Sequence, residues 1–144
     1  MNSKEFSQDL FDECDDRAKD LVRKTMIGEG YAIIKNIDKY GVDLIDPVNH
    51  RYIEVAIMQS WKWTDEFPYK TVLLNGRKKK FITGKTIFFL LNNDCTKAVV
   101  IKDSSCTDDR IVEVPNIFVS NGEMYFEIPL SEVEIIEING GQKK

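Results

Sequence analysis

Two carboxylates lie inside neighbouring apolar segments of this 144-residue chain, where a charged side chain is unexpected. Asp43 belongs to "VDLI" and Glu54 to "YIEVAIM", and the turn-forming segment "DPVNH" lies between them. A lone buried carboxylate is costly unless it is paired with a cation or binds a metal. Alternation along a strand places Glu54 and position 56 on one face, and an adjacent strand could bring Asp43 beside Glu54. The two acids are therefore candidate metal ligands.

The chemistry of such a site follows from its donor atoms. Two carboxylates and the backbone carbonyl of Val55 would offer hard oxygen ligands, which suit Mg²⁺ or Mn²⁺. Such an ion polarises a phosphate and acidifies a bound water for in-line attack on a phosphodiester. The competing interpretation makes Asp43 and Glu54 ordinary residues on the solvent face of a two-sided sheet, with no metal.

The order helix, strand, strand with Asp43, strand with Glu54 resembles the core of the PD-(D/E)xK superfamily, the restriction-endonuclease-like nucleases. The family signature is an Asp at the start of one strand and Glu-x-Lys on the next. The resemblance covers roughly residues 8–62. It implies a Mg²⁺-dependent nuclease in which Asp43 and Glu54 hold the metal. In many members a carboxylate of the first helix assists, and Glu13 or Glu29 could take that place.

The chain departs from this pattern at position 56, where Ala56 replaces the lysine. Alanine cannot hold a proton, stabilise charge or orient water. One explanation is that the lysine has moved, in which case Lys62 is the nearest catalytic candidate and Lys70 the next. Gln59 could instead orient the water. The other explanation is an inactive site on a fold that is kept for binding.

A basic and aromatic segment follows the candidate metal ligands. Four cations stand together in "RKKK" with no acid among them, and two tryptophans precede them in "SWKW". Cations neutralise phosphates and flat rings stack on bases, so the pattern favours a nucleic-acid surface. The alternative places the tryptophans in the core and the lysines in a solvated turn. The predicted nucleic-acid contacts are Arg77, Lys78, Lys79, Lys80, Trp61 and Trp63.

Composition narrows the class of protein. Hydrophobic residues make up 42% and charged residues 31%, as in ordinary globular proteins. The longest apolar run, "IFFLL", is too short to cross a bilayer, and the acidic N-terminus does not resemble a signal peptide. We therefore expect a cytoplasmic protein with no membrane partner. His50 is the only histidine and no CxxC pair occurs, which argues against histidine-based hydrolysis and against zinc.

The net charge of −4 is unevenly distributed. Residues 31–102 carry 12 basic and 7 acidic side chains, whereas residues 1–30 have a net charge of −3 and residues 103–144 of −6. A basic centre could meet a polyanion. Alternatively, the acidic flanks balance the centre in the folded state.

The hydrophobic pattern predicts an α+β fold in a single domain, residues 1–144. An apolar stripe from Phe6 to Val22 predicts a helix that ends at Gly28 or Gly30. Three strands of a nuclease-like core sheet follow, within about residues 5–85, and an antiparallel β-rich extension occupies about residues 86–139. Asn121-Gly122 predicts a hairpin turn in the extension.

Together these features favour a small Mg²⁺-dependent protein that acts on nucleic acid or binds it. Two alternatives remain open. One is a catalytically inactive nuclease-fold module that binds or supports other molecules. The other is a β-rich interaction domain without any family link, whose short strands and acidic C-terminal portion would suit a homodimer.

Overall fold

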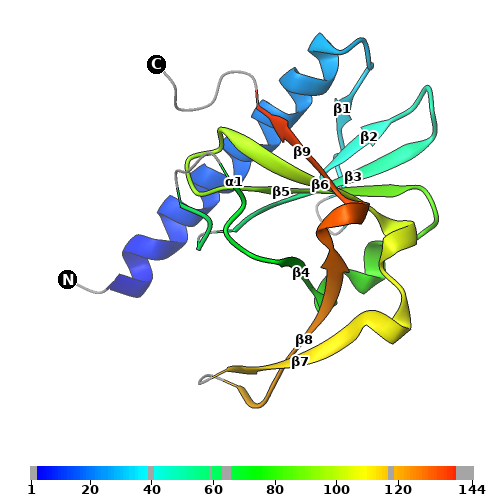
Figure 1. Cartoon of the computed structure of the whole chain (residues 1–144). Helices are drawn as coiled ribbons and strands as arrows, with labels where there is room; N and C mark the ends of the chain where they lie inside the picture. Colours follow the sequence, from blue (N-terminus) through cyan, green and yellow to red (C-terminus); the bar gives the residue numbers. More distant parts are fainter. Residues whose placement is uncertain (1–2, 39–40, 59, 63–65, 117–118, 139–144) are drawn as a thin grey trace.

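The protein is described from a computed structural model that covers residues 3–38, 41–58, 60–62, 66–116 and 119–138. Side chains are described from residue 16 onward, apart from 116 and 119–121. The fold is α+β, as the sequence predicts, with one long helix and a body dominated by sheets (Figure 1). Its helix and strands are α1 (Ser3–Gly28), β1 (Ile34–Lys35), β2 (Leu44–Asp46), β3 (Arg51–Ile57), β4 (Thr71–Asn75), β5 (Thr86–Leu91), β6 (Lys97–Lys102), β7 (Ile111–Asn116), β8 (Val119–Pro129) and β9 (Glu134–Glu137).

Two sheets form the body. The larger has six strands in the order β1-β2-β3-β5-β6-β9, and the smaller has the order β4-β8-β7. Only the β3–β5 pair is parallel among the strand pairs described, and the chain crosses between these two strands through β4 and the 3-10 helix Gly76–Phe81 (η1). Strands β5, β6 and β9 therefore extend the sheet that β1–β3 begin. The predicted boundary near residue 85 and the predicted three-stranded core sheet do not match this arrangement, because strand pairing joins segments from both halves.

The larger sheet is covered on both faces. Alternate residues of β3 and β5 point to opposite sides, so Ile53 and Phe89 pack with α1 whereas Phe88 and Leu90 pack with the smaller sheet. Figure 1 shows α1 along one side of the sheet and the β7–β8 ribbon extending from the other side of the body. A side chain of β3 at an even position thus faces the layer that contains β4, β8 and η1.

Helix α1 agrees with its predicted range. Its described apolar face, Ala18, Leu21, Val22 and Met26, is buried against the sheet. The helix ends at Gly28, and Gly30 then takes a positive φ of 101°, a conformation that glycine adopts without a Cβ penalty. Within the described residues, no helix has both the length and the apolar character needed to cross a membrane.

The hairpin turn predicted at Asn121-Gly122 is wrong. Strand β8 runs through both positions, and Asn116 of β7 pairs with Val119 of β8, so the connection falls at residues outside the described ranges. Gly122 does have a positive φ, 76°, but it sits beside a register irregularity between Val114 and Asn116. A Cβ there would lie 2.9 Å from the Val114 carbonyl oxygen. The glycine therefore serves a bulge within the ribbon.

Asp103 organises the loop that leads into β5. Its buried carboxylate oxygen Oδ2 accepts backbone N–H bonds from Thr83 (3.0 Å), Gly84 (2.8 Å) and Thr86 (3.1 Å). These bonds fix the segment that joins η1 to β5. The site described below depends on η1, so Asp103 supports it from a distance.

We expect Asp103→Ala to lower the free energy of unfolding by about 2 kcal/mol, because three backbone donors, one of them the buried N–H of Thr86, would lose their acceptor. Chemical denaturation monitored by circular dichroism measures the change. Asp108→Ala is the control, since this nearby aspartate is 84% exposed and should change stability little. Equal stability of the two variants would contradict the role assigned to Asp103.

Candidate active site

The register of β2 and β3 places Asp43 opposite Glu54. Leu44 pairs with Ile53 in this antiparallel ladder. Continuing the same register by one residue pairs Asp43 with Glu54, with both side chains on the same face. The side chain of Asp43 is fixed by β3 itself, because its Oδ2 accepts the backbone N–H of Val55 at 2.8 Å. The structure thus brings together the two carboxylates that the sequence predicts as metal ligands.

Glu54 is a buried carboxylate with only one of its oxygens satisfied. Its side chain is 8% exposed, and Oε2 lies 2.6 Å from the ammonium Nζ of Lys78. The other oxygen, Oε1, is buried and accepts no hydrogen bond. The pKa of Glu54 is raised to about 7: burial is the largest cause, the charge of Asp43 and a side-chain hydrogen bond with it act in the same direction, and Lys78 lowers the pKa. A proton or a cation is therefore favoured at this pair of acids.

Lys78 reaches Glu54 because η1 turns it inward. Asn75 caps the start of η1, since its side chain accepts the backbone N–H of Arg77 at 2.9 Å. The helix lies close to β8 at Gly76, where a Cβ would be 2.8 Å from the Met124 carbonyl oxygen. The side chain of Lys78 is 24% exposed, compared with 62% for Lys79. The basic run is therefore a short helix with one lysine directed into the fold.

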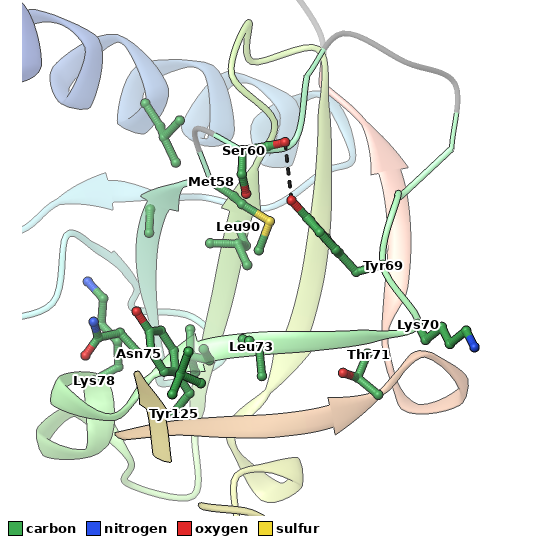
Figure 2. A pocket seen from close by; sticks show the side chains of 14 residues that line it. Met58, Ser60, Tyr69, Lys70, Thr71, Leu73, Asn75, Lys78, Leu90 and Tyr125 are labelled. Atoms are coloured by element: carbon green, nitrogen blue, oxygen red, sulfur yellow. Dashed lines mark hydrogen bonds between the residues drawn. The ribbon is translucent and has the colours of Figure 1, made fainter. Parts of the chain in front are cut away.

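Lys78, and not Lys62 or Lys70, takes the position beside Glu54. Lys62 is exposed beyond the end of β3. Lys70 precedes β4, and its side chain extends away from the cavity that adjoins the site (Figure 2). The catalytic role predicted for Lys62 thus lacks the geometry it requires. Gln59, the other substitute considered, lies outside the described residues.

The sequence contained a weak signal for Lys78. The acid-free run Arg77–Lys80 was recognisable as basic, and its residues were predicted to contact phosphate. Nothing in the spacing indicated that one of these lysines would pair with Glu54, which is 24 positions away. Lys19 of α1 was missed altogether, although its ammonium lies 3.2 Å from Asp43 Oδ1. Of the helix carboxylates considered, Glu29 is exposed, and the side chain of Glu13 is outside those described.

Most of the other predicted phosphate contacts are paired with acids of the C-terminal part. Arg77 pairs with Glu123, and Lys79 lies 3.4 Å from Asp108. Lys80 instead stands over the ring of Phe81, 5.1 Å from its centroid. The basic centre and the acidic flank therefore neutralise each other at these positions, as the alternative interpretation of the charge pattern holds.

The base-stacking role predicted for Trp61 is wrong. Its side chain is fully buried between the two sheets and meets Phe67 edge to face, with ring centroids 5.1 Å apart. A base cannot reach a ring in this position. Trp63 lies outside the described residues.

The acids and lysines form a compact set, Asp43, Glu54, Lys78 and Lys19. Carboxylate oxygens are ligands that suit Mg²⁺ or Mn²⁺. The oxygen Oε1 of Glu54 is buried and accepts no hydrogen bond. Among the described residues no three metal-ligating side chains cluster together. An ion held by two carboxylates would keep several waters, which is usual for Mg²⁺. The carbonyl of Val55, the third predicted ligand, belongs to the residue whose N–H already binds Asp43.

Comparison of the chain with known families, curated proteins and solved structures found no match. The geometry of the site is therefore the basis for inferring the function of this protein.

The raised pKa of Glu54 predicts a stability that falls with pH. Between the ordinary value of 4.5 and about 7 the folded state holds a proton that the unfolded chain releases. The contribution of Glu54 to the free energy of unfolding is therefore largest below pH 4.5. It decreases by at most about 3 kcal/mol as the pH rises to 7. Denaturation of the parent and of Glu54→Gln from pH 4.5 to 8 measures it. The variant lacks the ionisable carboxyl group, so its stability should not show this decrease. If the stabilities of parent and variant change with pH in the same way, the prediction is contradicted.

Proposed function

We propose that the protein is a small Mg²⁺-dependent phosphodiesterase that acts on nucleic acid. The observation that carries this proposal is the convergence of Asp43, Glu54 and Lys78 around a buried carboxylate oxygen with no donor. Two acids and an ammonium in contact are the chemical groups that hydrolysis of a phosphodiester needs.

Each residue has a role that follows from its position. The carboxylates of Asp43 and Glu54 would hold Mg²⁺, and Val55 keeps Asp43 in place through its N–H. The bound ion would polarise the phosphate and acidify a water. Lys78, anchored to Glu54 Oε2, places a positive charge next to the reacting phosphate, where charge develops during the reaction. Lys19 fixes the other oxygen of Asp43 and balances its charge.

The arrangement also supports the resemblance to the PD-(D/E)xK nucleases. A first helix, an antiparallel β1–β2–β3 meander, an Asp next to β2 and a Glu within β3 follow the order that suggested it. In this proposal the lysine function has moved from position 56 to Lys78 on η1. Ala56 then leaves room where the family pattern has a lysine.

A second candidate is an inactive module on the same fold, and one observation favours it. Lys78 and Lys19 already pair with Glu54 and Asp43, so the two negative charges are balanced without a metal. In that case the carboxylates and lysines would be a structural network. Metal binding separates the two candidates.

The test is Mg²⁺ binding by calorimetry together with cleavage of single-stranded DNA, duplex DNA and RNA in Mg²⁺. We expect the parent to bind the ion and to cleave, and we expect Asp43→Asn and Glu54→Gln to reduce cleavage to background. Glu137→Gln is the matched control, because Glu137 is also paired with a lysine, Lys97, but is 77% exposed on β9. It should behave as the parent does.

Metal binding without cleavage of any substrate would overturn the catalytic proposal, and absence of both would favour the inactive module. Cleavage that survives in Glu54→Gln would show that the activity does not arise at this site.

A further inference from the structure

A cavity lies between the two sheets directly beside the candidate active site. It has a volume of about 630 Å³, within the range of small-molecule sites. Its walls are mostly apolar, and its lining also includes polar side chains. In Figure 2, Lys78 and Asn75 lie at one end, Leu73 and Leu90 lie further along, and Lys70 stands at the other end with its side chain directed outward. We call this the intersheet cavity.

The intersheet cavity and the carboxylate site share one strand face and one lysine. Ala56 lines the cavity and is two positions after Glu54 on β3, so both side chains point to the same layer. Lys78 lines the cavity and also binds Glu54. A larger side chain at position 56 would occupy the end nearest Glu54. The short side chain of Ala56 therefore leaves this end of the cavity unfilled.

The walls leave apolar surface in contact with solvent. Several lining side chains are only half-buried although they lie between two packed layers, and Tyr125 adds an aromatic ring. Such a surface favours a flat, largely apolar occupant. The half-buried apolar lining residues are Ala56, Ile57, Met58, Leu73 and Val114.

We infer that the intersheet cavity receives the base of an unpaired nucleotide whose phosphate lies at Asp43, Glu54 and Lys78. The occupant must combine an anionic end, for Lys78, with a flat apolar body, for the cavity, and a nucleotide has both. A base that is paired and stacked cannot enter, so the substrate is single-stranded or locally unpaired nucleic acid. This inference rests on the proposed function and specifies its substrate.

The first measurement is binding, which does not require activity. We expect deoxyadenosine monophosphate to bind the parent roughly tenfold tighter than deoxyribose 5-phosphate, the order expected for one base on an aromatic and apolar wall. Ala56→Leu and Leu73→Phe fill the cavity from opposite walls and should each remove this difference. Met124→Phe is the control, because Met124 is 49% exposed, does not line this cavity and should leave the difference intact.

The second measurement is cleavage of a single-stranded oligonucleotide that carries one abasic position. We expect cleavage at that position to fall about tenfold, and Ala56→Leu to cause no further loss there. Equal binding of the two phosphates overturns the inference. Binding of indole as tight as that of deoxyadenosine also overturns the inference, since the cavity would then accept any apolar group.

The two proposals fail in different ways. Cleavage that ignores an abasic position overturns the base pocket and leaves the phosphodiesterase standing. Base-dependent nucleotide binding that Ala56→Leu removes, in a protein that cleaves nothing, supports the base pocket and overturns the phosphodiesterase.

Discussion

Lys78→Met should destabilise the protein by about 2 kcal/mol at pH 8 and by less than about 1 kcal/mol at pH 5. At pH 8 Glu54 is ionised, and the substitution leaves its carboxylate buried without the ammonium at 2.6 Å. At pH 5 Glu54 holds a proton, because its pKa is raised to about 7 and would rise further without Lys78. Lys78 then has no charge to stabilise. Urea denaturation of parent and variant at the two pH values measures the difference.

Two further variants make this result specific. Glu54→Gln in the Lys78→Met background should recover most of the stability at pH 8, because no charge then remains to be paired. Lys79→Met removes a lysine from the same short helix, but its partner Asp108 is 84% exposed, so little loss is expected. An equal loss from Lys78→Met at both pH values would show that the lysine contributes through packing and not through its charge.

Trp61→Ala should lower the free energy of unfolding by about 4 kcal/mol, the usual cost of emptying a large buried site. The ring is fully buried, packs in the core between the sheets and contacts Phe67. Trp61→Phe should cost much less. It keeps an aromatic ring and removes an indole N–H that is buried without an acceptor. Thermal and chemical denaturation measure both changes.

Trp61→Phe also tests the assignment of this residue to the core. Its affinity for single-stranded DNA should equal that of the parent, because a fully buried ring makes no contact with a ligand. A loss of affinity without a loss of stability would indicate that Trp61 belongs to the binding surface and not to the core.

The sequence was informative where the signal is local. The apolar period of α1 and the glycines that follow it are properties of one segment, and the helix has the predicted range. Asp43 and Glu54 are also close in sequence, joined by one turn, so the register of a short antiparallel pair was enough to place them together. The α+β class followed from the same kind of pattern.

The sequence was misleading where a local signal had more than one structural use. Asn121-Gly122 suits a hairpin turn, but a positive φ at Gly122 serves equally at a bulge inside a strand. Trp61 suits a stacking platform, but a large apolar ring is buried wherever the second layer covers it. Residue type restricted these positions without deciding between the outcomes.

Only the tertiary structure decided which cation serves Glu54. Lys62 and Lys70 are nearer in sequence, yet Lys78 contacts the acid because the chain returns through β4 and η1 before it joins β3 in the parallel pair with β5. The same crossover pairs Arg77 and Lys79 with acids far along the chain and encloses the intersheet cavity. These contacts join residues dozens of positions apart. They depend on how the two sheets pack, which no local period or spacing specifies.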